Sequence, residues 1–442
     1  MKHWLLVLAI LLWRFSVSAQ GTSLYFPPTT GTAWAATSPQ SLGWCQPRLD
    51  SLLNFLGRKH TKSFIILKNG RLVVEQYYGT FTRDSLWYWA SAGKSLTATL
   101  VGIAQQDGLL SLDDTTSRWL GRGWTSAPNA KERLIKVRHQ LTMTTGLDDT
   151  PPAPCDNEST RAACLLYRAD AGTRWAYHTG PYRLLQNDIA AASGLTINQY
   201  TNQKIGSRIG MGGGWLNDVY YSRARDMARF GLLMLNRGTW DQTVILRDTT
   251  YFRRMTTPSQ AFNRSYGYLW WLNGQPTYML PTSPLVYNGP LVPSAPADLI
   301  AALGKNDQKI YVVPSLGLVV VRQGNSAAQS KLAVSSFDTE LWQYIGAMLN
   351  CITAATTGRS AQVAFEAYPN PASSAVTVQL PAPVPPGASL LLTDMLGRVL
   401  HRTAAVAPAT RVSVDGVSAG LYQLQLVAAD GTPLGRQRLV KQ

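Results

Sequence analysis

Cysteine and histidine are scarce in this 442-residue sequence, which contains four of the first and five of the second. No two cysteines form a CxxC pair, and no two histidines have the spacing of metal ligands, which argues against zinc and thioredoxin-type sites. We therefore predict no metal and no cofactor. After the N-terminus, no stretch of the sequence is long and apolar enough to span a bilayer, so no transmembrane segment is expected.

Acidic residues are also few, because 25 Asp and Glu stand against 41 Lys and Arg, giving a formal net charge of +16. Residues 366–442 contain six basic and four acidic residues, so most of the excess belongs to the first 365 residues. A basic surface favours acidic partners such as envelope polymers. No basic run is interleaved with aromatic residues, so we predict no nucleic-acid partner.

Residues 1–19 have the pattern of a secretory signal peptide. Lys2 supplies the positive start, residues 4–13 form a short apolar run, and Val17-Ser18-Ala19 is a small-residue cleavage site. The run is too short for a membrane anchor. We therefore expect an exported protein, with an irregular segment at residues 20–44.

The four cysteines are expected to form disulfides, since the chain is predicted to be exported and their number is even. Cys155 and Cys164 lie close together in a polar loop, which predicts one bridge between them. Cys45 and Cys351 would then form the second bridge and join the two ends of one domain. Free buried thiols are the alternative.

Residues 45–353 combine amphipathic helices with two strand pairs, one of them turning at Asn69-Gly70, a strong hairpin signal. The expected helices cover residues 47–56, 91–106, 182–192, 222–236 and 337–349, and the expected hairpins cover residues 63–77 and 309–322. Because one hairpin lies near each end, this order predicts a mixed α/β (α+β) domain whose sheet unites both ends, with a largely helical stretch between them.

The composition changes after this domain. Residues 354–365 are small and polar and are expected to form a linker. Residues 366–442 contain short alternating strands separated by turns, which predict a small C-terminal β-sandwich.

The strongest chemical signal is Ser91-Ala92-Gly93-Lys94 at the start of an apolar helix. Residues three apart lie on one face of a helix, so the lysine can reach the serine. A serine hydroxyl is a weak nucleophile and needs a nearby base. Because burial lowers the pKa of an amine, a lysine beside the serine can serve as that base or orient one. The pattern therefore predicts a nucleophilic serine at a helix N-terminus, where free N–H groups can stabilise an oxyanion.

This motif belongs to a longer resemblance. The sequence around Ser91 (WASAGKS), residues 108–114 (GLLSLDD), residues 137–147 (VRHQLTMTTGL), residues 172–180 (GTRWAYHTG) and residues 312–321 (VVPSLGLVVV) resemble the serine β-lactamase and penicillin-binding-protein family. The similarity is to its class C-like branch of esterases, D-aminopeptidases and nylon-oligomer hydrolases. It implies a β-lactamase-like fold, in which an antiparallel sheet is flanked by helices and accompanied by a helical subdomain.

The resemblance implies roles for individual residues. Ser91 matches the family's nucleophile, Lys94 its partner and Tyr177 the tyrosine of the Tyr-x-Asn motif, which acts as the base in this branch. A phenol has an ordinary pKa of ~10, so Tyr177 would need a neighbouring positive charge such as Lys94 to ionise near neutrality. The oxyanion hole is expected to comprise the backbone N–H groups of Ser91 and Lys305.

Two departures from the family affect the expected substrate pocket. Thr179 stands where the motif has asparagine, and Ala302-Leu303-Gly304 stands where β-lactamases have Lys-Thr-Gly. The cation that would hold a β-lactam carboxylate is therefore missing, and the Lys305 side chain, one residue later, is expected to point elsewhere. We place Thr179, Ala302, Gly304 and His178 at the pocket, although His178 can equally be a structural histidine.

Two other candidates are set aside. His139 is expected to be a structural histidine. Residues 416–420 match the GxSxG motif, but that motif needs a following helix, whereas residues 421–427 alternate like a strand. We therefore interpret residues 416–420 as a turn.

The C-terminal segment carries a second resemblance. Tyr368-Pro369-Asn370-Pro371, residues 392–398 (LTDMLGR) and residues 418–422 (SAGLY) resemble the C-terminal sorting domain of type IX secretion cargo. The resemblance covers residues 366–442 and implies recognition by the secretion machinery, with a secreted or cell-surface protein exported through the periplasm of a gram-negative cell.

These observations predict an exported serine hydrolase that cleaves an ester or amide bond of a small molecule or short peptide through an acyl-enzyme on Ser91. The absence of a cation at Ala302 makes β-lactams an unfavourable main substrate. The alternative is a non-catalytic relative that binds a ligand or acts as a scaffold, which the departures at Thr179 and Ala302 favour. Retention of Ser91, Lys94 and Tyr177 together favours the enzyme.

Overall fold

The computed structural model describes residues 24–350, 364–380, 383–394 and 398–442. The chain forms two compact units that divide between positions 351 and 352. In the part of the chain that the structure describes, no helix has the length and apolar character needed to cross a membrane.

A six-stranded antiparallel sheet forms the centre of the first unit, with strand order β2-β1-β13-β12-β11-β8. These strands are β1 (Thr61–Lys68), β2 (Arg71–Tyr77), β8 (Trp271–Leu272), β11 (Ile300–Gly304), β12 (Gln308–Val313) and β13 (Leu318–Gly324). The N-terminal hairpin pairs with the C-terminal one through β1 and β13, which confirms the predicted sheet uniting both ends. Small sheets pair β3 (Trp87–Tyr88), β5 (Val219–Ser222) and β4 (Gly214–Leu216), β6 (Thr239–Trp240) with β7 (Thr243–Val244), and β9 (Thr277–Met279) with β10 (Val286–Asn288).

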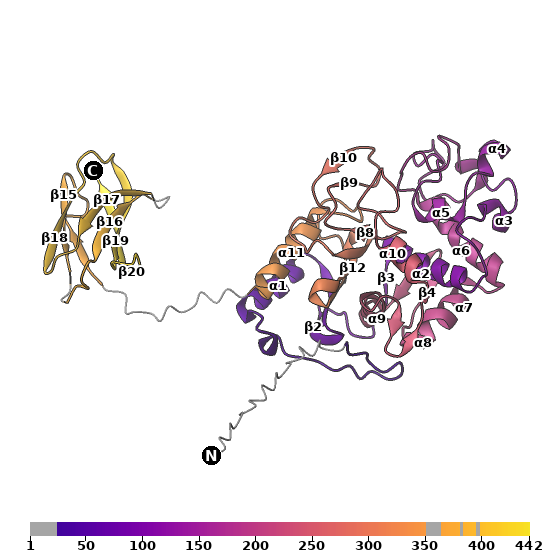
Figure 1. Ribbon diagram of the computed structural model, residues 1–442, viewed down its shortest axis with the longest axis horizontal. Coiled ribbons are helices and arrows are strands. Elements are labelled where there is room, and N and C mark those ends of the chain that lie inside the picture. Colours follow the sequence, from indigo (N-terminus) through magenta and orange to yellow (C-terminus); the bar gives the residue numbers. More distant parts are fainter. Residues whose placement is uncertain (1–23, 351–363, 381–382, 395–397) are drawn as a thin grey trace, which may run out of the picture. The chain divides into compact units, whose positions relative to one another are not determined.

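The helices of the first unit are α1 (Gln46–Arg58), α2 (Gly93–Gln106), α3 (Thr116–Leu120), α4 (Asn129–Glu132), α5 (Val137–Leu141), α6 (Thr179–Ser193), α7 (Ile197–Thr201), α8 (Ser207–Ile209), α9 (Ala224–Leu235), α10 (Thr249–Met255) and α11 (Ser336–Leu349). The terminal pair α1 and α11 lies together on one side of the sheet, and α9 lies on the other (Figure 1). Phe55 joins α1 to α11, because its ring stacks 5.8 Å from Phe337 and 4.3 Å from Tyr344. Helices α2 to α8 gather beyond α9 as the helical part of the unit.

Three predicted helices begin two or three residues from the expected start, and one of them, predicted from residue 222, starts at Ala224. The helix predicted from residue 91 starts at Gly93, because Ala90 has the left-handed φ of 48° and Ser91 lies in a preceding 3-10 turn, η2 (Ala90–Ala92). The helix predicted from residue 182 starts at Thr179. Pro181 is compatible with this start because the first turn of a helix has no internal acceptors for its N–H groups.

The second unit consists of two antiparallel sheets, with orders β14-β15-β18 and β17-β16-β19-β20. The strands are β14 (Glu366–Tyr368), β15 (Ala375–Gln379), β16 (Ser389–Thr393), β17 (Val399–Ala404), β18 (Ala409–Ser413), β19 (Gly420–Val427) and β20 (Pro433–Lys441). Buried side chains of both sheets, such as Val376 and Leu424, form one apolar core, as predicted for a small β domain. The GxSxG segment runs directly into strand β19, which confirms that it is no nucleophile elbow.

Candidate active site

Ser91 lies in turn η2, held close to the end of strand β11. The N–H group of Trp89, just before the turn, donates to the carbonyl of Tyr220 at 2.8 Å. A Cβ added at Gly304 would lie 2.4 Å from the carbonyl oxygen of Trp89 and 3.1 Å from the amide nitrogen of Ala92. Only glycine permits this approach, which brings the end of β11 against the turn that carries the serine.

Lys94, in the first turn of α2, is buried and directed at the serine. Its Nζ donates to Oγ of Ser91 at 3.0 Å and to Oγ1 of Thr179 at 3.4 Å, and it lies 4.3 Å from the ring centre of Tyr182. Burial lowers the pKa of Lys94 to about 7. The negative charge of Glu158 opposes this decrease, and the positive charges of Arg183 and Lys305 add to it. A large fraction of Lys94 is therefore neutral near pH 7 and able to accept a proton.

Tyr177 completes the group from the loop before α6. Its ring is 7% exposed, stacks on Trp271 at 5.8 Å and meets the edge of Tyr266 at 6.2 Å. Burial raises the pKa of Tyr177, and a hydrogen bond with the side chain of Ser91 lowers it, with burial the larger effect. The phenol is therefore neutral at physiological pH and can donate or relay a proton. These directions favour Lys94 over Tyr177 as the initial proton acceptor.

His178 does not join the group. It is 2% exposed, and its ring nitrogens form no hydrogen bond with any described residue. Burial lowers its pKa to about 4, and its charged neighbours are Asp149, Arg174 and Asp148. His139 is structural, because its Nδ1 accepts from the Lys136 N–H group at the start of α5, at 3.1 Å.

The third-motif residues lie on and just after β11. Ala302 is fully buried and is paired with Ile310 of β12, so no cation stands at its position. Lys305 follows the strand, and its exposed Nζ lies 3.6 Å from Oε1 of Glu158. The side chain was expected to point elsewhere, yet it lies near enough to lower the pKa of Lys94.

A charged cluster beside the site was missing from the sequence prediction. Glu158 lies between two cations, with Oε2 at 2.6 Å from Nη2 of Arg183 and Oε1 facing Lys305. Both Glu158 and Arg183 act on the pKa of Lys94. Arg183 lies one turn beyond Thr179 on α6, and this spacing could have placed it near the site. Glu158 belongs to a loop whose sequence has no periodicity that would have placed it there.

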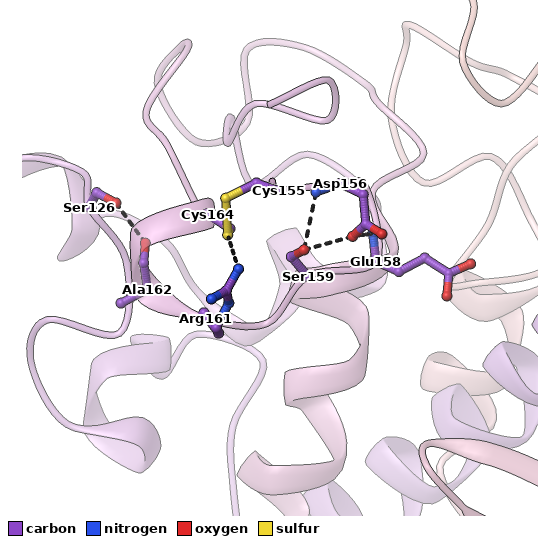
Figure 2. The surroundings of a disulfide bond; sticks show 8 residues. All are labelled: Ser126, Cys155, Asp156, Glu158, Ser159, Arg161, Ala162 and Cys164. Atoms are coloured by element: carbon purple, nitrogen blue, oxygen red, sulfur yellow. Dashed lines mark hydrogen bonds between the residues drawn. A yellow bond between two sulfur atoms is a disulfide. The ribbon is translucent and has the colours of Figure 1, made fainter. Parts of the chain in front are cut away.

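Glu158 belongs to the loop closed by the predicted Cys155–Cys164 disulfide, which is present (Figure 2). At one end of this loop, Oγ of Ser126 donates to the carbonyl of Ala162 at 2.6 Å. The second predicted bridge stays a prediction because Cys351 lies outside the described residues. Cys45 has no disulfide partner among the described residues, and its N–H group donates to the carbonyl of Met348, near the end of α11.

Tyr177 also borders a cavity of about 360 Å³. Met279, Leu280 and Val286, from the β9–β10 region, form an apolar part of its wall. Arg174 also lines it and is paired with Asp149 at 2.6 Å. A larger cavity of about 630 Å³, lined by α9 and α10, contains none of the predicted site residues. In the described residues, no group of three or more His, Cys, Asp or Glu side chains is arranged to hold a metal ion.

The fold is of the β-lactamase type, and it brings Ser91, Lys94 and Tyr177 together at one place. Residues 57–333 match the family model described as Beta-lactamase, and the chain belongs to that family. Residues 366–441 match the model described as Secretion system C-terminal sorting domain, which indicates export to the outside or to the cell surface.

Solved structures agree on the fold. A Bacteroides dorei protein assigned as a β-lactamase has a TM-score of 0.56 and 19% identity, over 70% of this chain and 99% of its own. A Bacillus anthracis protein assigned as a 6-aminohexanoate-dimer hydrolase has a TM-score of 0.56 and 19% identity, over 73% of this chain and 89% of its own. EstCE1, a hydrolase with promiscuous acyltransferase activity, has a TM-score of 0.52 and 14% identity, over 70% of this chain and 99% of its own.

Proposed function

We propose that the protein is an exported serine hydrolase that cleaves an ester or amide bond through an acyl-enzyme on Ser91. The observation that carries the proposal is the buried Lys94 ammonium group, 3.0 Å from the serine hydroxyl, with its pKa lowered to about 7. A serine hydroxyl beside a base that is partly neutral at working pH is the arrangement that nucleophilic catalysis requires.

In the proposed acylation, neutral Lys94 accepts the hydroxyl proton while Oγ of Ser91 bonds to the substrate carbonyl carbon. The developing oxyanion lies between the backbone N–H groups of Ser91 and Lys305, a placement supported by the close approach of β11 to turn η2. The proton of Lys94 then passes through the hydroxyl of Tyr177 to the leaving alcohol or amine as its bond to carbon breaks. Water attacks the acyl ester with the same base, and Ser91 regains its proton.

Neutral esters and short amides are the substrate class that the surroundings favour. Ala302 provides no cation for a β-lactam carboxylate, and Arg174 at the cavity is already paired with Asp149. The apolar wall beside Tyr177 suits an uncharged acyl or leaving group. The 6-aminohexanoate-dimer hydrolase and the hydrolase with promiscuous acyltransferase activity among the similar structures support acyl transfer as the class of reaction.

The test is turnover of chromogenic short-chain esters and anilides by the full-length protein. We expect Ser91→Ala to abolish turnover and Ser418→Ala, in the GxSxG segment of the other unit, to preserve it. A non-catalytic relative, the reading favoured by Thr179 and Ala302, would bind such compounds without turnover. Turnover that persists in Ser91→Ala would refute the assignment of the nucleophile.

A further inference from the structure

The loop closed by the Cys155–Cys164 bridge holds the backbone at Tyr177 and in the three residues that follow it. Nδ2 of Asn157 donates to the carbonyl of Tyr177 at 2.9 Å, and its Oδ1 accepts from the N–H group of Thr179 at 3.0 Å. The backbone carbonyl of Asn157 accepts from the N–H group of Gly180 at 2.8 Å. One loop residue therefore fixes the segment that carries the phenol and begins α6.

The neighbours of Asn157 contact the same segment. A Cβ added at Gly180 would lie 2.2 Å from the carbonyl oxygen of Ser159, so loop and helix meet backbone to backbone. Glu158 accepts from Arg183 through its carbonyl at 3.0 Å and through Oε2 at 2.6 Å. Residues 157–159 thus contact residues 177–183 continuously, from the segment that carries Tyr177 into the first turns of α6.

The disulfide connects residues 157–159 to the buried, hydrogen-bonded segment around Cys164. Cys164 is 1% exposed, and on either side of it Ser126 donates to the carbonyl of Ala162 at 2.6 Å and, through its N–H group, to that of Leu165 at 3.1 Å. Cys155, at the other end of the bridge, is two residues from Asn157. Closing a short loop removes conformations from its residues, so the bridge restricts where Asn157 can lie.

We propose that Asn157 is a positioning residue for Tyr177, and that the Cys155–Cys164 bridge keeps it in place, so that fast acylation of Ser91 requires the oxidised loop. This inference rests on the proposed function, because it assigns the loop to that same site. The rings of Trp271 and Tyr266 hold the phenol from its sides, and Asn157 fixes its backbone. A misplacement of about 1 Å in a catalytic group can cost about 100-fold in rate.

The first test compares Asn157→Ala with Asn198→Ala in the full-length oxidised protein. Asn198 forms a similar pair of side-chain bonds, donating to the carbonyl of Trp215 at 3.1 Å and accepting from its N–H group at 2.7 Å. A fluorophosphonate probe gives the affinity KI and the acylation rate constant kinact separately. We expect Asn157→Ala to lower kinact by about 10- to 100-fold with KI nearly unchanged, and Asn198→Ala to leave both unchanged.

The second test replaces the bridge with serines at Cys155 and Cys164. We expect this double serine variant to have a lower kinact than the wild-type protein. When it is combined with Asn157→Ala, the loss should be smaller than the sum of the two separate losses, because both changes act through the position of Asn157. Additive losses, or a normal kinact in either variant, would overturn the proposal.

Amide hydrogen exchange gives a readout that does not depend on activity. The N–H groups of Thr179 and Gly180 should lose protection in Asn157→Ala and in the double serine variant, while the amide of Trp215 keeps its own. If the oxidised wild-type protein forms no adduct at all, the proposed function has failed, and exchange alone decides the positioning role. Unchanged protection at Thr179 and Gly180 would then refute it.

Discussion

Replacing Lys94 with methionine should stabilise the first unit at neutral pH while abolishing acylation. Burial lowers the pKa of Lys94 from 10.5 to about 7. The unfolded chain therefore holds a proton between these pH values that the folded chain lacks. Each pKa unit corresponds to 1.36 kcal/mol, so the buried amine costs about 5 kcal/mol of stability well below pH 7 and about 4 kcal/mol at pH 7.

The sign of the pH dependence follows from the same difference. Wild-type stability rises with pH from about 7 to 10.5, because the unfolded state binds more protons in this window. At pH 9.5 the remaining cost is about 1 kcal/mol. Lys94→Met also removes the hydrogen bonds to Ser91 and Thr179, worth roughly 1 kcal/mol each. We expect a net gain of about 2 kcal/mol at pH 7 that disappears by pH 9.5.

Urea unfolding followed by tryptophan fluorescence measures this difference in the full-length protein. All 14 tryptophans lie before residue 352, so the signal reports the first unit alone. The other titrating groups are common to both proteins, and their contributions largely cancel in the comparison. The reasoning is refuted if Lys94→Met is no more stable than wild type at pH 7, or if the gap between them does not narrow toward pH 9.5.

Three further predictions concern the surroundings of the site. Gly304→Ala should destabilise the first unit by about 1–3 kcal/mol and slow acylation, because the added Cβ meets backbone atoms. The control is Gly346→Ala on α11, where no atom lies within 4 Å of the added Cβ. In urea unfolding this variant should be neutral or slightly stabilising. Glu158→Gln should move the apparent pKa of acylation downward, since Glu158 raises the pKa of Lys94; an unmoved or raised value in a pH–rate profile would contradict this. Asp188→Asn should stabilise the unit more at pH 7 than at pH 4, because burial raises the pKa of Asp188 and its carboxyl therefore costs more stability as the pH rises above the pKa of the unfolded chain. Equal effects at both pH values in the same unfolding assay would refute this.

Much of the fold was predictable because its signals are local. The Asn69-Gly70 turn and the apolar runs on either side of it identify a hairpin, and β1 and β2 form it. The same holds for the strands β12 and β13 near the other end. The start of α2 was misplaced because the left-handed conformation of Ala90 depends on packing between turn η2 and β11, which no local pattern encodes.

The candidate site was predictable only where chemistry requires a fixed spacing. Ser91 and Lys94 stand one helical turn apart, so their contact follows from sequence, whereas Tyr177 was placed by family resemblance. Asn157 and Glu158 act from an irregular loop whose position depends on a disulfide and on contacts with α6. His178 was placed at the pocket because it adjoins Tyr177, and this stays a prediction: its side chain is buried, and Asp149, Arg174 and Asp148 are its charged neighbours.

The most direct measurement of the central claim is intact mass of the full-length protein after exposure to a fluorophosphonate, with Ser91→Ala alongside. In the expected reaction Oγ of Ser91 bonds to phosphorus, fluoride leaves, and the hydroxyl proton passes to Lys94. We predict one adduct on the wild-type protein, mapped to Ser91 by peptide sequencing, and none on the variant. No adduct on folded, disulfide-bonded wild-type protein, or an equal adduct on Ser91→Ala, would contradict a nucleophilic Ser91.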